Sequence, residues 1–395
     1  MMEPALAGDP APRAFLRVGG ANLARHQLAL ALLAKCERVI CIARDFSPEL
    51  SALQHEAERG GARFHVVTGP RGLSGLITAS DDVLVMAEGL LPTTGDALRL
   101  LDGPAAVFVQ PAESGVPAGF ERIDLNYAAA GLMVVPGRLV DRLMELPVDT
   151  DPGSTLLRIA LQAGVAQRPV PDEVRLGGRW LLVRSEAEAH AAEDSWMNRH
   201  TADGPATPGP LLGRWLVRRF GPALLHGGSG SGVVAVIALV LALIGLALAW
   251  FGFGAIGLGL TGIGWILRGA AAMLARIQRE SLSQRSDYPL RRFAADAVFD
   301  LVLIAILTLA LPALPGQLLI EHSFAPVVLI GLLRLLPRAF PGGWSDWAED
   351  RLVLVVVLVV LALGRVLTAG VPGLVLLLLI AGLAMPRGGE RLTRA

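Results

Sequence analysis

The chain has 395 residues, of which 53% are hydrophobic and 18% are charged, and its acidic and basic side chains balance at 35 each. This composition excludes an ordinary soluble globular protein, and the balanced charge excludes the chain-wide basic field that nucleic-acid binding needs. We therefore expect a membrane protein without a nucleic-acid partner.

The opening residues, MMEPALAGDPAPR, contain no basic start followed by an apolar core, so we expect no secretory signal and a first half that stays in the cytoplasm. From Arg13 to about Gln162, β-rich runs such as RVICIA, RFHVVTG and DVLVMA alternate with stretches of helical period such as LSALQHEAERGG. Strands and helices in turn predict an α/β domain with a mostly parallel sheet, which we assign to residues 1–199.

Residues 200–211 are rich in Pro, Gly, Thr and Ala, which predicts a linker. The next stretch, LLGRWLVRRFGPALL, places Trp215 and Phe220 among three arginines. This mixture suits an amphipathic helix at a membrane interface, and an ordinary capping helix is the alternative. We assign residues 200–230 to this linker and interfacial helix.

Residues 231–395 contain about six apolar segments, each of roughly the length that crosses the hydrocarbon layer of a bilayer. They predict an all-α, multi-pass membrane domain, with segments near 232–252, 254–273, 296–314, 322–338, 351–367 and 369–385.

Arginines fall on alternate connections between these segments. They precede the first segment, lie between the second and third and between the fourth and fifth (Arg334, Arg338 and Arg351), and follow the last. By the positive-inside rule, both termini and the connection at 274–295 face the cytoplasm. We expect a bacterial inner-membrane protein.

The stretch GWILRGAAAMLARIQRE, followed by ADAVFD, resembles the CDP-alcohol phosphotransferases that carry an N-terminal nucleotidyltransferase-like domain. In that family the second span ends in D-x-x-D-G-x-x-A-R and the third begins with G-x-x-x-D-x-x-x-D. Ala275-Arg276 matches the A-R pair, and Asp296 and Asp300 match the last two aspartates. Arg268 stands at the first aspartate position, and Arg292 at the later glycine.

The resemblance implies a chemistry for these positions. The aspartates would hold Mg²⁺ or Mn²⁺, which neutralises the pyrophosphate of a CDP-alcohol. Asp296 would then be a metal ligand, Asp300 both a metal ligand and the base that deprotonates the acceptor hydroxyl, and Arg268, Arg276 and Arg292 would bind the substrate phosphate.

Other roles stay open for the same side chains. Arg268 is also explained as a positive-inside anchor at a helix end. Asp296 and Asp300 suit a helix N-terminus, and nearby arginines could offset their mutual repulsion in place of metal.

In the first half, FLRVGGANLARHQLALALLAKCERVICIA is similar to the segment that follows the glycine-rich loop of sugar-phosphate nucleotidyltransferases. Arg13 stands where that family has lysine, and Gly8 is what remains of the loop. Glu88 lies nearest to the metal-binding aspartate of the family. The resemblance implies a vestigial nucleotide site formed by these three residues.

The leading hypothesis is a CDP-alcohol phosphotransferase-like protein of phospholipid or sphingolipid head-group synthesis, which releases CMP if it is active and has membrane lipid and a CDP-alcohol as partners. The alternative is an inactive pseudoenzyme that acts as a scaffold, as a homodimer or with an active paralogue. A third hypothesis, a small transporter, predicts ionisable groups near the middle of spans, where Glu321 and Arg365 are the nearest candidates.

Overall fold

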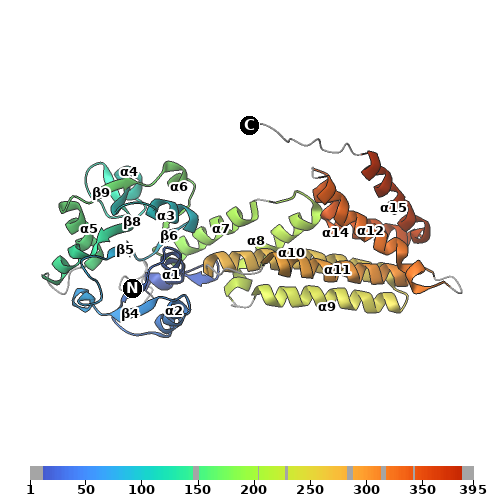
Figure 1. Ribbon diagram of the computed structural model, residues 1–395, viewed down its shortest axis with the longest axis horizontal. Helices are drawn as coiled ribbons and strands as arrows, with labels where there is room; N and C mark the ends of the chain where they lie inside the picture. The colour runs from blue at the N-terminus through green and yellow to red at the C-terminus, as the bar shows by residue number, and fades with distance from the viewer. Residues whose placement is uncertain are drawn as a thin grey trace. The chain divides into compact units, whose positions relative to one another are not determined.

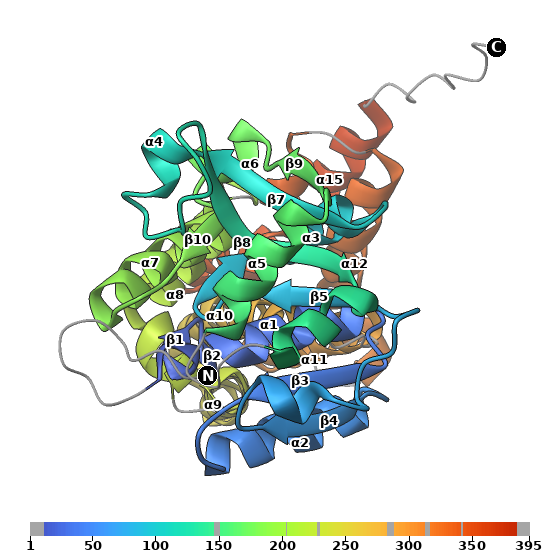
Figure 2. The same cartoon turned by 90° about the vertical axis from the view of Figure 1, so that its left-hand side faces the viewer.

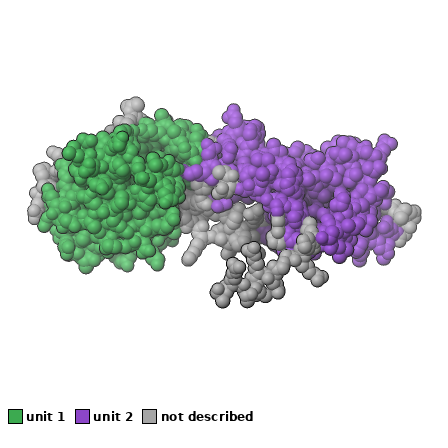
Figure 3. Space-filling model, turned by 90° about the horizontal axis from the view of Figure 1, so that it is seen from above, with its two compact units in different colours: residues 1–197, 278–284 green, residues 198–277, 285–395 purple. Residues whose placement is uncertain are grey.

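The computed structural model describes residues 12–145, 151–202, 204–226, 230–282, 288–312, 317–340 and 343–384 (Figure 1). The chain forms two compact units, which are coloured separately in Figure 3. Unit 1 comprises 1–197 and 278–284, and unit 2 comprises 198–277 and 285–395. Unit 1 is an α/β region, and unit 2 is helical.

Unit 1 contains short strands and helices that alternate along the chain. Its strands are β1 (Arg17–Val18), β2 (Ala21–Asn22), β3 (Arg38–Ile42), β4 (Arg63–Val67), β5 (Asp82–Met86), β6 (Leu90–Pro92), β7 (Ala106–Pro111), β8 (Tyr127–Pro136), β9 (Ala166–Pro169) and β10 (Trp180–Leu182). Its helices of five or more residues are α1 (Leu23–Leu33), α2 (Pro48–Arg59), α3 (Thr94–Leu101), α5 (Pro152–Gln162), α6 (Asp172–Leu176) and α7 (Glu186–Ala202), which continues past the unit boundary. The shorter turns are η1 (Arg13–Phe15), η2 (Pro70–Leu73), α4 (Ala112–Gly115), η3 (Gly137–Leu139) and the 3₁₀ turn η4 (Asp141–Glu145).

Local sequence signals explain where the first helices begin. The Asn22 side chain accepts a hydrogen bond from the Arg25 N–H and caps α1, and Ser47 caps α2 in the same way, with Pro48 at its first position. Both residues are favoured N-caps, and proline is tolerated there because the first helical N–H has no helical acceptor.

The described strands form four sheets, and the four-stranded sheet, ordered β5-β8-β7-β9, is mixed. The prediction of a mostly parallel sheet is therefore wrong for the strands that the structure describes. Among them, β8 runs antiparallel to both β5 and β7, and only β3/β4 and β7/β9 are parallel pairs. The connection at 112–126 returns the chain beside β7 without a helical crossover, which gives an antiparallel partner. Figure 2 shows β3 and β4 with α2, apart from β5.

Unit 2 consists of helices connected by short segments. They are α8 (Pro208–His226), α9 (Gly230–Trp250), α10 (Gly254–Leu282), α11 (Tyr288–Ala310), α12 (Leu319–Ala339), α13 (Ser345–Glu349), α14 (Arg351–Leu363) and α15 (Leu367–Ala384). Its hydrophobic core includes Leu258, Phe299, Leu303, Ile306, Leu307, Leu329 and Leu358. In Figure 1, α9, α10 and α11 run alongside one another.

Five helices of unit 2 are long and apolar enough to cross a membrane: α9, α10, α11, α12 and α15, counted over the described residues. The prediction of six spans is therefore too high by one within that part of the chain. The predicted segment 351–367 ends early, because Gly364 caps α14 and Arg365 adopts a left-handed φ of 58°. The 13 residues of α14 cover only about 20 Å, against a hydrocarbon layer of about 30 Å.

Small residues let α9 pack closely against its neighbours. The buried positions of α9 are Val234, Ala238, Ala242, Gly245 and Ala249, together with its first residue. At Gly245 an added Cβ would lie 2.5 Å from the backbone oxygen of Gly257 on α10. Such small-residue stripes are how helices approach one another where lipid removes the hydrophobic driving force.

The region predicted to be a linker is mostly helical in the structure. Helix α7 extends to Ala202, and α8 begins at Pro208. Trp215 and Phe220 on α8 are exposed and meet edge to face, with ring centroids 6.4 Å apart. Arg214, in contrast, is buried and donates to the Pro205 carbonyl. The exposed aromatic pair is what an interfacial helix would present, and that location stays a prediction.

Candidate functional site

The two motif aspartates lie one turn apart on α11, as their spacing predicts, but they contact different helices. Asp296 forms an ion pair with Arg268 of α10. The same guanidinium lies over the ring of Trp265, 4.0 Å from its centroid. Arg268 is thus held from two sides, by a carboxylate and by a cation–π contact.

Asp300 is buried in unit 2 and accepts hydrogen bonds from two arginines. Nε of Arg351 lies 2.8 Å from Oδ1, and Nη2 of Arg351 lies 3.2 Å from Oδ2. Nε of Arg334, on α12, also donates to Oδ2. Asp300 and Arg351 are each 4% exposed, so this is a buried ion pair of the kind that needs additional hydrogen bonds. Arg334 keeps one buried nitrogen, Nη2, without a hydrogen-bond partner among the described residues.

A third acidic residue, Asp350, lies directly before α14 and has a structural role. Its Oδ1 accepts from the Leu352 N–H at the start of α14, and its Oδ2 accepts from the Gly209 N–H at 2.7 Å. It therefore caps α14 and joins it to the first turn of α8. An added Cβ at Gly209 would lie 2.4 Å from Asp350 Oδ1, which explains why glycine stands there.

This donor set does not suit Mg²⁺ or Mn²⁺. The two aspartates contribute two negative charges, and Arg268, Arg334 and Arg351 contribute three positive ones, so the group carries a formal charge of +1. Divalent cations select sites rich in free carboxylate oxygens. Both oxygens of Asp300 already accept from guanidinium groups, and the described residues contain no group of three or more His, Cys, Asp or Glu that could hold a metal ion.

Of the two remaining predicted substrate-binding residues, the structure describes the side chain of Arg276 alone. Arg276 is exposed on α10, two turns beyond Arg268. Arg292 belongs to α11, but its side chain lies outside the described residues.

Two members of the cluster were assigned a different role from the sequence. From their positions in the sequence, Arg334 and Arg351 are expected to be topology signals, whereas in the structure both pair with Asp300. The signal that could have found them is Asp300 itself, since an acid inside an apolar helix requires a cationic partner.

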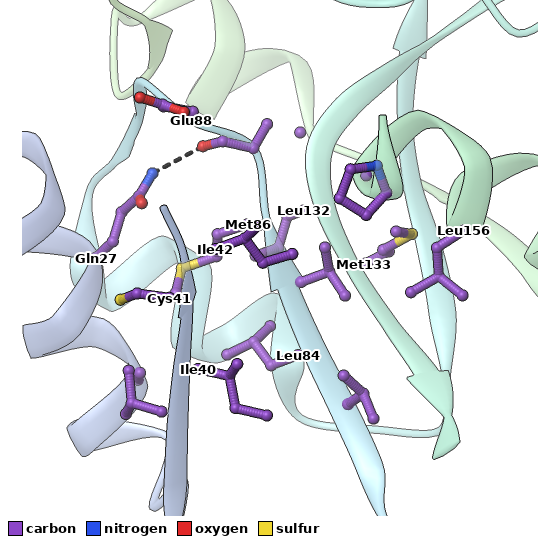
Figure 4. Close-up of a pocket in the computed structure, with 18 of the residues that line it drawn as sticks. Gln27, Ile40, Cys41, Ile42, Leu84, Met86, Glu88, Leu132, Met133 and Leu156 are labelled. Atoms are coloured by element: carbon purple, nitrogen blue, oxygen red, sulfur yellow. Dashed lines mark hydrogen bonds between the residues drawn. The ribbon is translucent and has the colours of Figure 1, made fainter. Parts of the chain in front are cut away.

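In unit 1 two of the three predicted nucleotide-site residues line a cavity of about 840 Å³ between β3 and β5. Arg13 and Glu88 both line it, and Glu88 Oε1 accepts from the Ala14 N–H at 3.1 Å. Gln27 of α1 donates to the carbonyls of Ala87 and Leu90 at the same end (Figure 4). Gly8 lies outside the described residues.

The walls of this cavity are largely apolar side chains of the two strands and the neighbouring elements, including Ile40, Ile42, Leu84, Met86, Leu132 and Leu156 (Figure 4). Burial in this wall raises the pKa of the Cys41 thiol to about 11. The thiol is therefore protonated at neutral pH and is a poor nucleophile or metal ligand there.

No model of a known protein family matches the chain, and no curated protein matches it either.

Proposed function

We propose that the chain is a multi-pass membrane protein related to the CDP-alcohol phosphotransferases, in which the helical unit acts as a non-catalytic scaffold or partner subunit in phospholipid or sphingolipid head-group synthesis. The observation that carries this proposal is the pairing of both motif aspartates with arginines: Asp296 with Arg268, and Asp300 with Arg334 and Arg351. Its location, on the evidence of arginine placement, is a bacterial inner membrane with both termini cytoplasmic.

The charge of the cluster argues against metal-dependent transfer. At an effective dielectric constant of 20, each pair of unit charges about 4 Å apart interacts by roughly 4 kcal/mol. A divalent cation beside a group with a formal charge of +1 is therefore repelled. It would also have to break hydrogen bonds of two guanidinium groups to reach Asp300.

The same contacts argue against Asp300 as the general base. Both of its carboxylate oxygens already accept hydrogen bonds from guanidinium groups, so neither is placed to accept a hydrogen bond from a substrate hydroxyl. Transfer from a CDP-alcohol to a hydroxyl would lack both the metal charge and the base that the family resemblance implies.

One observation favours the rival function, an active transferase that releases CMP. Nη2 of Arg334 is buried and has no hydrogen-bond partner among the described residues. A phosphate oxygen is a hydrogen-bond acceptor whose geometry matches a guanidinium group. A phosphate-bearing substrate would therefore supply the acceptor that Nη2 of Arg334 lacks. In this rival function Arg268, Arg276 and Arg334 bind phosphate, and Mg²⁺ or Mn²⁺ enters only if the ion pairs open.

An assay of the purified full-length protein in lipid nanodiscs distinguishes the scaffold from the transferase. The protein is incubated with a panel of CDP-alcohols and either Mg²⁺ or Mn²⁺, and CMP release is measured. We expect CMP release equal to that of Asp296→Asn and Asp300→Asn variants, and no binding of Mn²⁺ by electron paramagnetic resonance. Metal-dependent CMP release that either substitution abolishes would establish the transferase and reject the scaffold.

For unit 1 we propose a nucleotidyltransferase-like origin with vestigial nucleotide binding, supported by the presence of Arg13 and Glu88 in the wall of one cavity. Binding of CTP or CDP to the full-length protein, measured by calorimetry and compared with Glu88→Gln and Arg13→Gln variants, tests it. Equal affinity in all three proteins would reject a role for these residues.

A further inference from the structure

Arg334 on α12 has one end of its guanidinium group available for a further hydrogen-bond acceptor. Its Nε donates to Asp300, but the end formed by Nη1 and Nη2 makes no hydrogen bond among the described residues. Nη2 is buried, whereas 23% of the side-chain surface stays exposed. This end of the guanidinium therefore lies between the buried ion pairs and the surface of unit 2.

The formal charge around Arg334 favours an anion as its further partner. Asp300 supplies one negative charge to both Arg334 and Arg351, so the three side chains in contact carry a formal charge of +1. The neighbouring Asp350 gives both of its carboxylate oxygens to backbone N–H groups. Asp300 and Arg351 are each 4% exposed, so partners and not water must stabilise the charges of this group. One negative group beside Arg334 would make it neutral.

The exposed face of α12 continues from Arg334 along the apolar length of the helix. Val327 and Leu335 on this face are 47% and 61% exposed. Gly331 lies between them, and an added Cβ there would meet no atom within 4 Å. Residues four positions apart share one face of a helix, so Gly331 leaves a notch between two larger apolar side chains. The opposite face of α12 packs in the core of unit 2.

Phe293, where the apolar span of α11 begins, borders the guanidinium group. The guanidinium carbon of Arg334 lies 5.4 Å from the ring centroid, and the Phe293 side chain is 50% exposed. Exposed side chains change rotamer within nanoseconds, so this ring can move aside when a ligand approaches Nη2. The open end of Arg334 can therefore be reached from outside unit 2.

A membrane phospholipid combines the two groups that these features fit. Its phosphate is negatively charged, and its paired oxygens match the two-nitrogen end of a guanidinium group. Its acyl chain is apolar and runs from the head group into the hydrocarbon layer. Arg334 lies in the last two turns of α12 and Gly331 lies nearer the middle of the helix, so the phosphate and the acyl chain meet them in this order.

We propose that Arg334 binds the phosphate of one membrane phospholipid through its Nη1 and Nη2 nitrogens. The acyl chain of this lipid lies in the notch at Gly331, along the exposed face of α12. The phosphate neutralises the ion pairs around Asp300, and the lipid is held without a chemical step. This inference rests on the proposed membrane location of unit 2, but not on whether the protein transfers a phospho-alcohol.

Native mass spectrometry of the full-length protein in detergent tests the phosphate contact. Phosphatidylglycerol is added in steps, without CDP-alcohol or divalent metal. Arg334→Lys keeps a positive charge beside Asp300 but replaces the two-nitrogen end by one ammonium group. We expect its affinity for the first phosphatidylglycerol to fall about tenfold, because a charge-assisted hydrogen bond is lost. The control is Arg365→Gln, which removes an exposed arginine beyond the end of α14 and should leave the affinity unchanged.

A second variant tests the acyl-chain contact and leaves the ion pairs intact. Gly331→Phe fills the notch from a position with open space around the new Cβ, so unit 2 should keep its fold and its unfolding midpoint. We expect phosphatidylglycerol to bind about tenfold more weakly, which corresponds to about two methylene groups that are no longer buried. Gly373→Phe on α15 is the matched control, since its added Cβ also meets no atom within 4 Å.

Inorganic phosphate distinguishes a lipid from a free anion. Added in excess, it should leave phosphatidylglycerol bound, because it lacks the contacts of the acyl chain. Displacement of the lipid by inorganic phosphate would assign Arg334 to free phosphate and overturn the proposal. Equal phosphatidylglycerol affinity in Arg334→Lys and Arg365→Gln would also overturn it. Because lipid binding and CMP release are measured separately, CMP release would reject the scaffold and leave the lipid site standing.

Discussion

Arg351, the first residue of α14, contacts Asp300 of α11 at both carboxylate oxygens, with its Nε 2.8 Å from Oδ1 and its Nη2 3.2 Å from Oδ2. Both residues are almost fully buried. The contact joins two helices that are far apart in the sequence and fixes the start of α14 against the side of α11. The stability of unit 2 should therefore depend on it.

Removing one partner of this pair should destabilise unit 2. We expect Arg351→Leu to lower the free energy of unfolding by about 3 kcal/mol, because Asp300 keeps only Arg334. Asp300→Asn should cost more, since it leaves two guanidinium groups without their carboxylate. Thermal unfolding in detergent, followed by circular dichroism, measures both. Arg338→Leu is the matched control, because Arg338 is exposed on α12, and an equal loss in that variant would contradict the role of the buried pair.

Asp350 should contribute through its two backbone hydrogen bonds. Asp350→Ala removes the cap of α14 and the acceptor of the Gly209 N–H, so we expect a loss of about 1–2 kcal/mol in the same unfolding measurement. Asp350→Asn keeps one carbonyl oxygen as a hydrogen-bond acceptor, so its free energy of unfolding should fall by less than that of Asp350→Ala. Glu349→Ala, at an exposed neighbouring position, should have almost no effect. An alanine variant as stable as the control would reject the capping role.

The close approach of α9 and α10 predicts a size limit at Gly245. Valine there would place a side chain against the backbone of Gly257, and we expect overpacking to cost about 1–3 kcal/mol. Gly259→Val on α10 adds the same side chain where no atom lies within 4 Å of the new Cβ. Unfolding midpoints in nanodiscs compare the two. The prediction fails if Gly245→Val is as stable as Gly259→Val.

The stability of unit 1 should fall in acid because of His26. Burial lowers the pKa of His26, its hydrogen bond to the Val18 carbonyl opposes this shift, and the charge of Arg25 adds to it. The ring is packed against Trp196. Below the ordinary pKa of about 6.5, the unfolded chain therefore binds a proton that the folded chain does not, and stability is lost as the pH falls.

Unfolding midpoints between pH 7.5 and 5.5 test this effect. We expect the unfolding midpoint of His26→Gln to fall less between pH 7.5 and 5.5 than that of the unaltered protein. The midpoint of His55→Gln, a substitution at an exposed position, should fall as much as that of the unaltered protein. Identical pH profiles for all three proteins would show that His26 does not contribute.

The features of the fold that depend on local pattern could be predicted from the sequence. Alternating strands and helices in the first half, the apolar helices of the second half and the shared helix turn of Asp296 and Asp300 all follow from spacing along the chain. The end of α14 at Leu363 was missed, because Gly364 and Arg365 stop the helix inside an apolar run that hydropathy alone would continue.

Features that depend on distant segments were not predictable in the same way. The pairing of β8 with β5 joins segments more than 40 residues apart, and the partners of Asp300 depend on how α11, α12 and α14 pack. Arg334 and Arg351 carry the same local signal as any arginine at a membrane boundary. Only the packing of three helices distinguishes an ion-pair partner from a topology signal.

The short helix α14 begins inside the protein. It falls about 10 Å short of the hydrocarbon thickness, and Asp300 lies about 10 Å along α11 from Phe293, where the apolar span of that helix begins. Asp350 and Arg351, the cap and the first residue of α14, are both buried, and α8 and α13 contact the helix. Neighbouring helices therefore enclose the charged start of α14, and its charged groups are matched with one another within unit 2 and not with lipid head groups.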